Sequence, residues 1–133
     1  MEKKFKRDLS ELVNIVAMTE SVFKKAGLEA GLRNVVDLAT EELFVNMVKY
    51  NIETTEDILI RMVPHTHGIE VSLTDYDVER FDPTSAGQVD VNAPLDERTA
   101  GGLGLYLVLK MVDSIHYEYR NRQSKITFIV DRD

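Results

Sequence analysis

Hydrophobic residues recur at spacings of three and four in three stretches of the chain, a period that predicts amphipathic helices. The first stretch ends at Gly27, and glycine is typical of helix C-termini because it adopts a left-handed backbone without strain. In the second stretch, Glu42 and Asn46 lie four residues apart beside the apolar stripe. The predicted helices cover residues 9–26, 30–50 and 103–113.

Four other stretches alternate apolar and polar residues or are rich in β-branched residues, a pattern that predicts strands. In the second of these, the period of two places Asp75 on the same face as Val71 and Leu73. Asp75 is therefore expected to point toward the core. The predicted strands are residues 58–63, 69–75, 115–119 and 126–130, with turns at 64–68 and 121–124.

This order of elements predicts an α+β fold: a two-layer sandwich in which helices cover one face of a mostly antiparallel sheet. A length of 133 residues, 44% of them hydrophobic, predicts one domain over residues 1–133. The segment from Asp77 to Ala100 has no periodicity. Loops of this length in small domains are usually functional, often as lids.

Charge and composition exclude several classes of function. The formal net charge is −7 and the basic residues are scattered, so we expect no nucleic-acid partner. The chain has no cysteine, which excludes disulfides and thiolate chemistry. No apolar run of transmembrane or signal length occurs, so we expect a cytoplasmic protein without membrane contact.

The glycines at positions 101, 102 and 104 directly precede or begin the third predicted helix. Small residues and a helix N-terminus together form a phosphate-binding arrangement, although the same glycines also suit tight helix packing. A dinucleotide-binding motif is excluded because no strand immediately precedes the glycines, and a P-loop is excluded because no Gly-Lys-Ser/Thr occurs.

Three further sets of polar residues have alternative interpretations. Glu42 and Asn46 form either a solvated helix edge or an inward-facing carboxylate and amide that hold a metal ion and orient a hydroxyl. Asp75 is either a turn former or an acceptor for a base amino group. His65 and His67 fall in a predicted hairpin tip without a third ligand, which favours a surface turn over a metal site.

In this order and at these intervals, the three motifs resemble the GHKL ATPase superfamily and, more closely, its stand-alone anti-sigma-factor serine/threonine kinases. Glu42 and Asn46 match Glu-x-x-x-Asn, and residues 101–108 match Gly-Gly-x-Gly-Leu-x-Leu-Val without a gap. Phe81-Asp82-Pro83 matches a segment that commonly follows the family's Asp-x-Gly. The resemblance covers nearly the whole chain and implies the Bergerat, or histidine-kinase-like ATPase, fold.

The chain departs from the family at the second motif. Where the family has Asp-x-Gly, this chain has Asp75-Tyr76-Asp77. Alignment backward from Phe81 instead puts Asp77 in the acidic position and Val78 in the glycine position. Neither alignment restores the glycine that lets the backbone approach the base.

The resemblance implies a role for each matching residue. Asn46 would coordinate Mg²⁺ on the phosphates of ATP, and Glu42 would orient or deprotonate the attacking hydroxyl. Asp75 would accept from the adenine amino group, with Thr127 supporting the adenine pocket. The remaining implied site residues are Arg98 at the terminal phosphate, Gly101, Gly102 and Gly104 around the phosphates, and an ATP lid at 82–100.

The leading hypothesis is a serine/threonine kinase that binds a sigma factor and phosphorylates an antagonist protein, with a homodimer implied by the resemblance. The alternative is a degenerate module that keeps the fold and binds a regulatory protein, with weak or no ATP binding. The catalytic domain of a sensor histidine kinase is disfavoured because these 133 residues leave no room for a phosphoacceptor helix pair.

Overall fold

The computed structural model describes residues 1–80 and 102–131. Three helices and five strands occur in this part of the chain, together with two short 3₁₀ turns. In chain order they are β1 (Glu2–Phe5), a 3₁₀ turn (Leu9–Glu11), α1 (Leu12–Ala26), a 3₁₀ turn (Ala30–Leu32), α2 (Arg33–Tyr50), β2 (Ile58–Pro64), β3 (Gly68–Tyr76), α3 (Gly102–Met111), β4 (Ser114–Arg120) and β5 (Gln123–Asp131).

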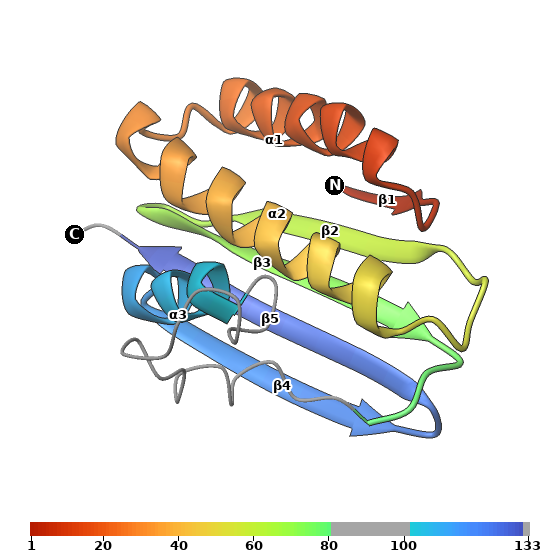
Figure 1. Cartoon of the computed structure of the whole chain (residues 1–133). Helices are drawn as coiled ribbons and strands as arrows, with labels where there is room; N and C mark the ends of the chain where they lie inside the picture. The colour runs from red at the N-terminus through yellow and green to blue at the C-terminus, as the bar shows by residue number, and fades with distance from the viewer. Residues whose placement is uncertain (81–101, 132–133) are drawn as a thin grey trace.

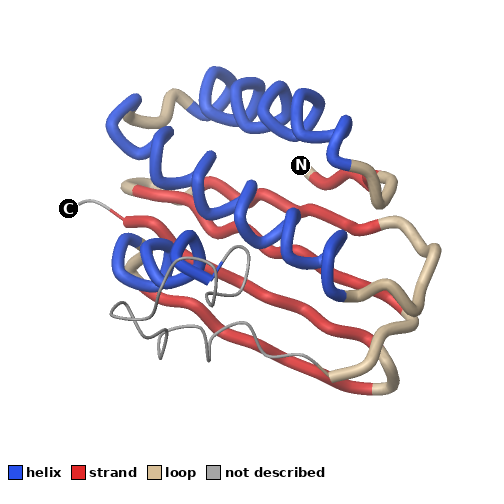
Figure 2. Tube along the Cα trace, in the orientation of Figure 1, coloured by secondary structure: helices blue, strands red, loops and turns tan. Residues whose placement is uncertain are grey.

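The strands form one antiparallel sheet in the order β1-β2-β3-β5-β4. All three helices lie on the same face of this sheet, with α2 between α1 and α3 (Figure 1; Figure 2). This arrangement confirms the predicted α+β fold. Within the described ranges, no helix is both long enough and apolar enough to cross a bilayer.

The core lies between the helices and the inner face of the sheet. Alternate residues of the three central strands face the helices, as the period of two requires. From α2, Phe44 and Leu43 pack into this layer, and α3 adds Leu105 and Val108. The strand residues of the core include Ile58, Ile60, Met62, Ile69, Val71, Leu73, Ile126, Phe128 and Val130.

The ends of α1 follow from local sequence. Asp8 caps the 3₁₀ turn that leads into the helix, because its carboxylate accepts a hydrogen bond of 2.9 Å from the Ser10 N–H. The helix ends at Gly27, whose φ of 64° lies in the left-handed region. The Leu28 N–H then donates to the Phe23 carbonyl at 3.0 Å. The predicted glycine stop is confirmed.

Strand β1 was not predicted from the sequence. Its residues are Glu-Lys-Lys-Phe, and only Phe5, 1% exposed, is buried. An edge strand needs one row of hydrogen bonds, and exposed lysines protect its free edge from pairing with other chains. The charged sequence is therefore compatible with a strand but gives no apolar alternation to predict it.

The turn between β4 and β5 is shorter than the predicted range of 121–124. Asn121 and Arg122 have φ values of 53° and 60°, and Arg120 pairs directly with Gln123. Two central residues with positive φ are typical of a type I′ turn, whose twist suits an antiparallel hairpin. Gln123 and Ser124 therefore belong to β5. This shift adds Ser124 to the residues of β5 that face the core.

Candidate functional site

The middle of α2 lies against the first turn of α3, and the contact joins Glu42 to Gly104. A Cβ added at Gly104 would lie 2.3 Å from Oε2 and 2.4 Å from Cδ of Glu42. Any side chain at position 104 would therefore displace the carboxylate. The structure brings together a glutamate and a glycine that are 62 residues apart in the sequence, at the N-terminal end of a helix.

The Glu42 carboxylate is half-buried, and its surroundings favour the protonated form. Burial raises the pKa of Glu42, and the neighbouring Glu41 carboxylate raises this pKa further, whereas Lys49 opposes the shift. A carboxylate with a raised pKa accepts a proton more readily near neutral pH. Glu42 is thus suited to accept a proton from a hydroxyl.

Asn46 lies one helical turn after Glu42 and is 4% exposed. Its Nδ2 donates a hydrogen bond of 3.0 Å to the Glu42 backbone carbonyl. This bond uses the amide nitrogen and leaves the amide oxygen as the atom with which Asn46 can ligate a cation. A buried amide oxygen is a ligand that suits Mg²⁺.

Among the described residues, Asn46 does not belong to a preformed cluster of metal ligands. Across residues 1–80 and 102–131, no group of three or more His, Asp or Glu side chains is placed to hold a metal ion. Mg²⁺ commonly binds with few protein ligands and completes its coordination with substrate phosphates and water. The residues therefore fit Mg²⁺ only in company with a phosphate-bearing ligand. His65 and His67 are exposed in the β2–β3 turn, as expected for a surface turn.

Part of the predicted site lies outside the described residues. This applies to Arg98, Gly101 and the lid expected at 82–100. Gly102 is described as the first residue of α3. The predicted roles of these residues therefore stay predictions.

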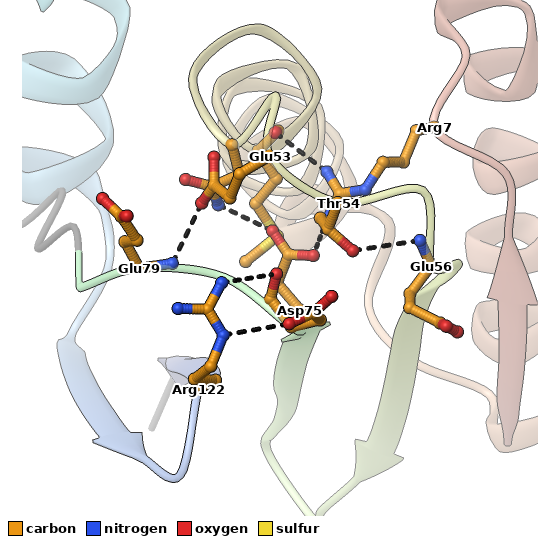
Figure 3. A network of polar contacts seen from close by, with 10 residues as sticks. Arg7, Glu53, Thr54, Glu56, Asp75, Glu79 and Arg122 are labelled. Carbon is orange, nitrogen blue, oxygen red and sulfur yellow. Dashed lines mark hydrogen bonds and ion pairs between the residues drawn. The ribbon is translucent and has the colours of Figure 1, made fainter.

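Asp75 lies near the end of β3 on the core face, and it is 0% exposed. Its Oδ1 forms an ion pair with Nη2 of Arg7, and its Oδ2 accepts a hydrogen bond of 2.6 Å from Nδ2 of Asn51. Arg7 also donates from Nη1 to the Met47 carbonyl at 3.0 Å. Figure 3 shows Arg7 and Asp75 pointing toward each other beneath the end of α2. The contacts inside the protein thus engage both carboxylate oxygens.

Sequence reasoning missed Arg7 and Asn51. Arg7 stands in a run of charged residues whose pattern predicts only a solvated segment, and its contact with Asp75 spans 68 residues of sequence. Asn51 caps the C-terminal end of α2 and lies 5% exposed. A polar residue directly after a predicted helix is a weak signal, because such residues occur at many helix ends.

Asp77 stands where the family motif has glycine, and its backbone has a φ of 57°. Side chains other than glycine adopt this conformation uncommonly, with Asp and Asn among the more frequent exceptions. Asp77 is exposed, and its Oδ1 forms an ion pair of 2.9 Å with Nε of Arg122. The left-handed backbone at Asp77 is the conformation that suits a glycine. It therefore supports the alignment in which Asp75-Tyr76-Asp77 replaces Asp-x-Gly, with Asp77 in the glycine position.

The structure does not bring Thr127 to the side of the sheet that bears Asp75. Ile126 and Phe128 face the core, so Thr127 between them faces the opposite side. Ser124 instead pairs directly with Asp75 in the β3–β5 register and is 3% exposed. The same period of two would have identified Ser124 had the turn been placed at residues 121 and 122.

Val78 follows β3 and connects the end of this strand to the β4–β5 hairpin. It is 0% exposed, its N–H donates to the Arg122 carbonyl at 2.9 Å, and its carbonyl accepts from the Tyr119 hydroxyl at 2.8 Å. The Glu79 N–H donates to Oε1 of Glu53 at 2.9 Å (Figure 3). These contacts tie the segment after β3 to the β4–β5 hairpin and to the segment after α2.

The site thus extends along α2. Glu42 lies against α3, Asn46 follows one turn later on α2, and Asn51 lies at the other end beside Asp75. At 1.5 Å per residue, the nine steps from residue 42 to residue 51 span about 13 Å. An extended nucleoside triphosphate has a similar length. The Glu42 carboxylate beside Gly104 lies where the resemblance places the phosphates, and the Asp75 cluster lies where it places the base.

The comparisons with known proteins agree with this fold. Residues 5–130 match the family model of the histidine kinase-like ATPase domain. The chain therefore belongs to the histidine kinase-like ATPase domain family, within the GHKL superfamily, whose members bind ATP. A search of curated protein sequences finds no match.

Two solved structures show the same fold. The histidine kinase AdeS of Acinetobacter baumannii aligns with a TM-score of 0.53 at 13% identity, over 98% of this chain and 67% of that one. The histidine kinase domain of the blue-light-activated kinase EL346 from Erythrobacter litoralis aligns with a TM-score of 0.51 at 8% identity, over 92% of this chain and 60% of that one. At these identities, the likeness shows the fold alone.

Proposed function

We propose that this chain is an ATP-dependent protein serine/threonine kinase of the anti-sigma-factor type, which acts in bacterial partner switching. The observation that supports this proposal is the Glu42 carboxylate lying against Gly104 at the start of α3. A carboxylate whose pKa is raised can accept a hydroxyl proton, and it lies here beside a helix N-terminus that can bind a phosphate. The stand-alone kinase branch uses a glutamate at this position of the motif.

In this proposal Glu42 accepts the proton of a serine or threonine hydroxyl as the oxygen attacks the terminal phosphate of ATP. Asn46 would hold Mg²⁺, which neutralises phosphate charge when it is bound with ATP. The N–H groups at the start of α3 would bind phosphate oxygens through their unpaired donors and the helix dipole. The transferred phosphoryl group leaves ADP and forms a phosphoserine or phosphothreonine on the acceptor protein. Arg98 is the proposed contact of the terminal phosphate.

The test is transfer of labelled phosphate from ATP to a candidate antagonist protein in the presence of Mg²⁺. We expect label on serine or threonine of the antagonist, and no label when Mg²⁺ is chelated. An antagonist whose acceptor hydroxyl is replaced by alanine is the matched control. If label stays on ATP with every antagonist encoded near this chain's gene, the kinase proposal is wrong.

A second candidate function is a regulatory protein-binding module that has lost nucleotide binding. The observations that favour it are the enclosed Asp75 carboxylate and the aspartate in the glycine position at 77. Calorimetry with ATP, in the presence and absence of Mg²⁺, separates the two candidates. Heat of binding supports the kinase, and its absence at high nucleotide concentration supports the binding module.

The proposed partners are a sigma factor, its antagonist and a second copy of this chain. On α1, Val13 is 75% exposed and Val16 is 43% exposed, and Leu9 in the preceding 3₁₀ turn is 44% exposed. A groove of about 290 Å³ runs beside them, with Asp37 and Thr40 of α2 in its lining. One apolar face repeated on two copies suits a two-fold symmetric interface. We therefore assign this face to the homodimer.

Replacing Val13 by glutamate should convert the homodimer to a monomer. The substitution places a charge in an apolar contact, and an unpaired buried charge is strongly unfavourable. Light scattering coupled to size-exclusion chromatography measures the mass of the variant and of the unaltered chain. Glu20→Ala, an exposed change on the same helix, is the control. A V13E mass equal to that of the unaltered dimer would exclude this face.

A further inference from the structure

The base end of the site is closed by the protein's own side chains. Asp75 has no exposed surface, and its two oxygens are engaged by Arg7 and Asn51. Val78, three residues further along the chain, is also fully buried. A carboxylate in this position cannot accept a hydrogen bond from an amino group of an outside molecule unless one of its internal partners moves.

Arg7 is the partner that holds this arrangement together. Its guanidinium bridges the segment after β1, the last turn of α2 through the Met47 carbonyl, and the end of β3 through Asp75. The Arg7 side chain is 11% exposed. Burial lowers the pKa of Arg7, and the nearby Glu53 carboxylate opposes this shift, but a guanidinium remains charged.

The relative strengths of the two interactions decide whether a base can displace Arg7. Leaving one member of a buried ion pair alone is disfavoured by roughly 200- to 5,000-fold in an equilibrium constant. A well-formed pair of hydrogen bonds to a base edge improves discrimination between bases by about 10- to 100-fold. The contact with Arg7 is therefore the stronger one, and Asp75 stays paired with Arg7.

We propose that Arg7 is a specificity-determining residue: it keeps Asp75 from reading the base, so the site binds nucleoside triphosphates through their phosphates and does not distinguish ATP from GTP. The proposal rests on the proposed function, in which this domain binds a nucleotide. The substrate class is then nucleoside triphosphates rather than ATP alone. Asp75 then has a structural role, and the phosphate end at Glu42, Asn46 and Gly104 provides the affinity.

The first test measures the dissociation constants of ATP and GTP, each with Mg²⁺, by calorimetry on the complete chain. We expect the two constants to agree within fivefold. A preference for ATP greater than fivefold would overturn the proposal. The Arg7→Ala variant frees the carboxylate and should gain a preference for ATP of at least fivefold. Lys6→Ala, an exposed neighbour, is the control and should gain none.

A second variant keeps the test decisive if R7A does not fold. Asp75→Asn removes the charge and keeps the shape, so it should leave the ratio of ATP to GTP affinity unchanged within fivefold. It should also lower the melting temperature by about 10 °C through loss of the buried pair. A selective loss of ATP affinity in D75N would show that Asp75 reads adenine and would overturn the proposal.

The melting measurement separates this proposal from the proposed function. If neither nucleotide binds the unaltered chain, the proposed function fails and the melting of D75N decides whether Asp75 is held in place. A melting temperature equal to that of Asp57→Asn, an exposed control, would overturn the structural role of Asp75. A large loss confined to D75N would support that role.

Discussion

Glu42→Gln should lower the rate of phosphoryl transfer to a protein hydroxyl by about 10²- to 10⁴-fold, the range that a general base contributes. Glutamine keeps the size and position of the side chain against Gly104 but cannot accept the proton. Nucleotide affinity should be retained, because in this proposal Asn46 and the start of α3 hold the phosphates. The measurement is single-turnover transfer of labelled phosphate to the antagonist protein.

The control for this substitution is Glu41→Gln, which removes an exposed charge one residue away. E41Q should transfer phosphate at nearly the unaltered rate near neutral pH, because loss of the Glu41 charge lowers the raised pKa of Glu42 and leaves Glu42 able to accept a proton. Full activity in E42Q would remove Glu42 from the mechanism. Loss of nucleotide binding together with transfer would instead point to a role in holding the phosphates.

The raised pKa of Glu42 adds an expected pH dependence to the same prediction. Transfer should decline as the pH falls through the pKa of Glu42, because the protonated carboxyl cannot accept the hydroxyl proton. The folded state holds this proton more tightly than the unfolded state does. The free energy of unfolding should therefore decrease as the pH rises from the ordinary glutamate pKa through the raised one. E42Q should lack this decrease, and denaturant titrations across that window measure the difference.

Gly104→Ala should separate stability from activity. The new Cβ would lie 2.3 Å from Oε2 of Glu42, so the flexible carboxylate has to move away. Alanine favours a helix over glycine by about 1 kcal/mol, so the free energy of unfolding should stay equal or rise slightly. Phosphoryl transfer should fall by about 100-fold, because a displacement of about 1 Å at a reacting group has that effect.

Gly31→Ala is the matched control for this change. A Cβ at Gly31 meets only Oε1 of Glu29 at 3.7 Å, which is an ordinary contact. Denaturant titration and the transfer assay together test both variants. A G104A variant with unaltered transfer would mean that the contact between Glu42 and the start of α3 serves packing alone.

The sequence predicted the helices and the long strands because their apolar residues repeat at the period of the element that they form. Strand β1 has no such repeat, since hydrogen bonds to β2 and the burial of Phe5 hold it in place. The identity of the residue opposite Asp75 depended on the β4–β5 turn. A shift of two residues in that turn moved Ser124 into the sheet.

The candidate site was predictable where a motif lies within a few residues of sequence. Glu42 and Asn46 share one helix, and glycine at 104 marks a close approach of the kind that the structure shows. The partners of Asp75 were not predictable in this way. Arg7 reaches it across the sheet from near the N-terminus. Periodicity carries no information on such a long-range pair.

Strand β1 and Arg7 occupy the same short segment, and this links the sheet edge to the base end of the site. The strand is held by β2 along one side only, whereas Arg7 supplies the counter-ion of a carboxylate that has no other charged contact among the interactions described above. A foreign strand that displaced β1 from β2 would detach β1 and Arg7 together. A partner that competes with β1 for pairing with β2 would thus also expose the Asp75 carboxylate in β3.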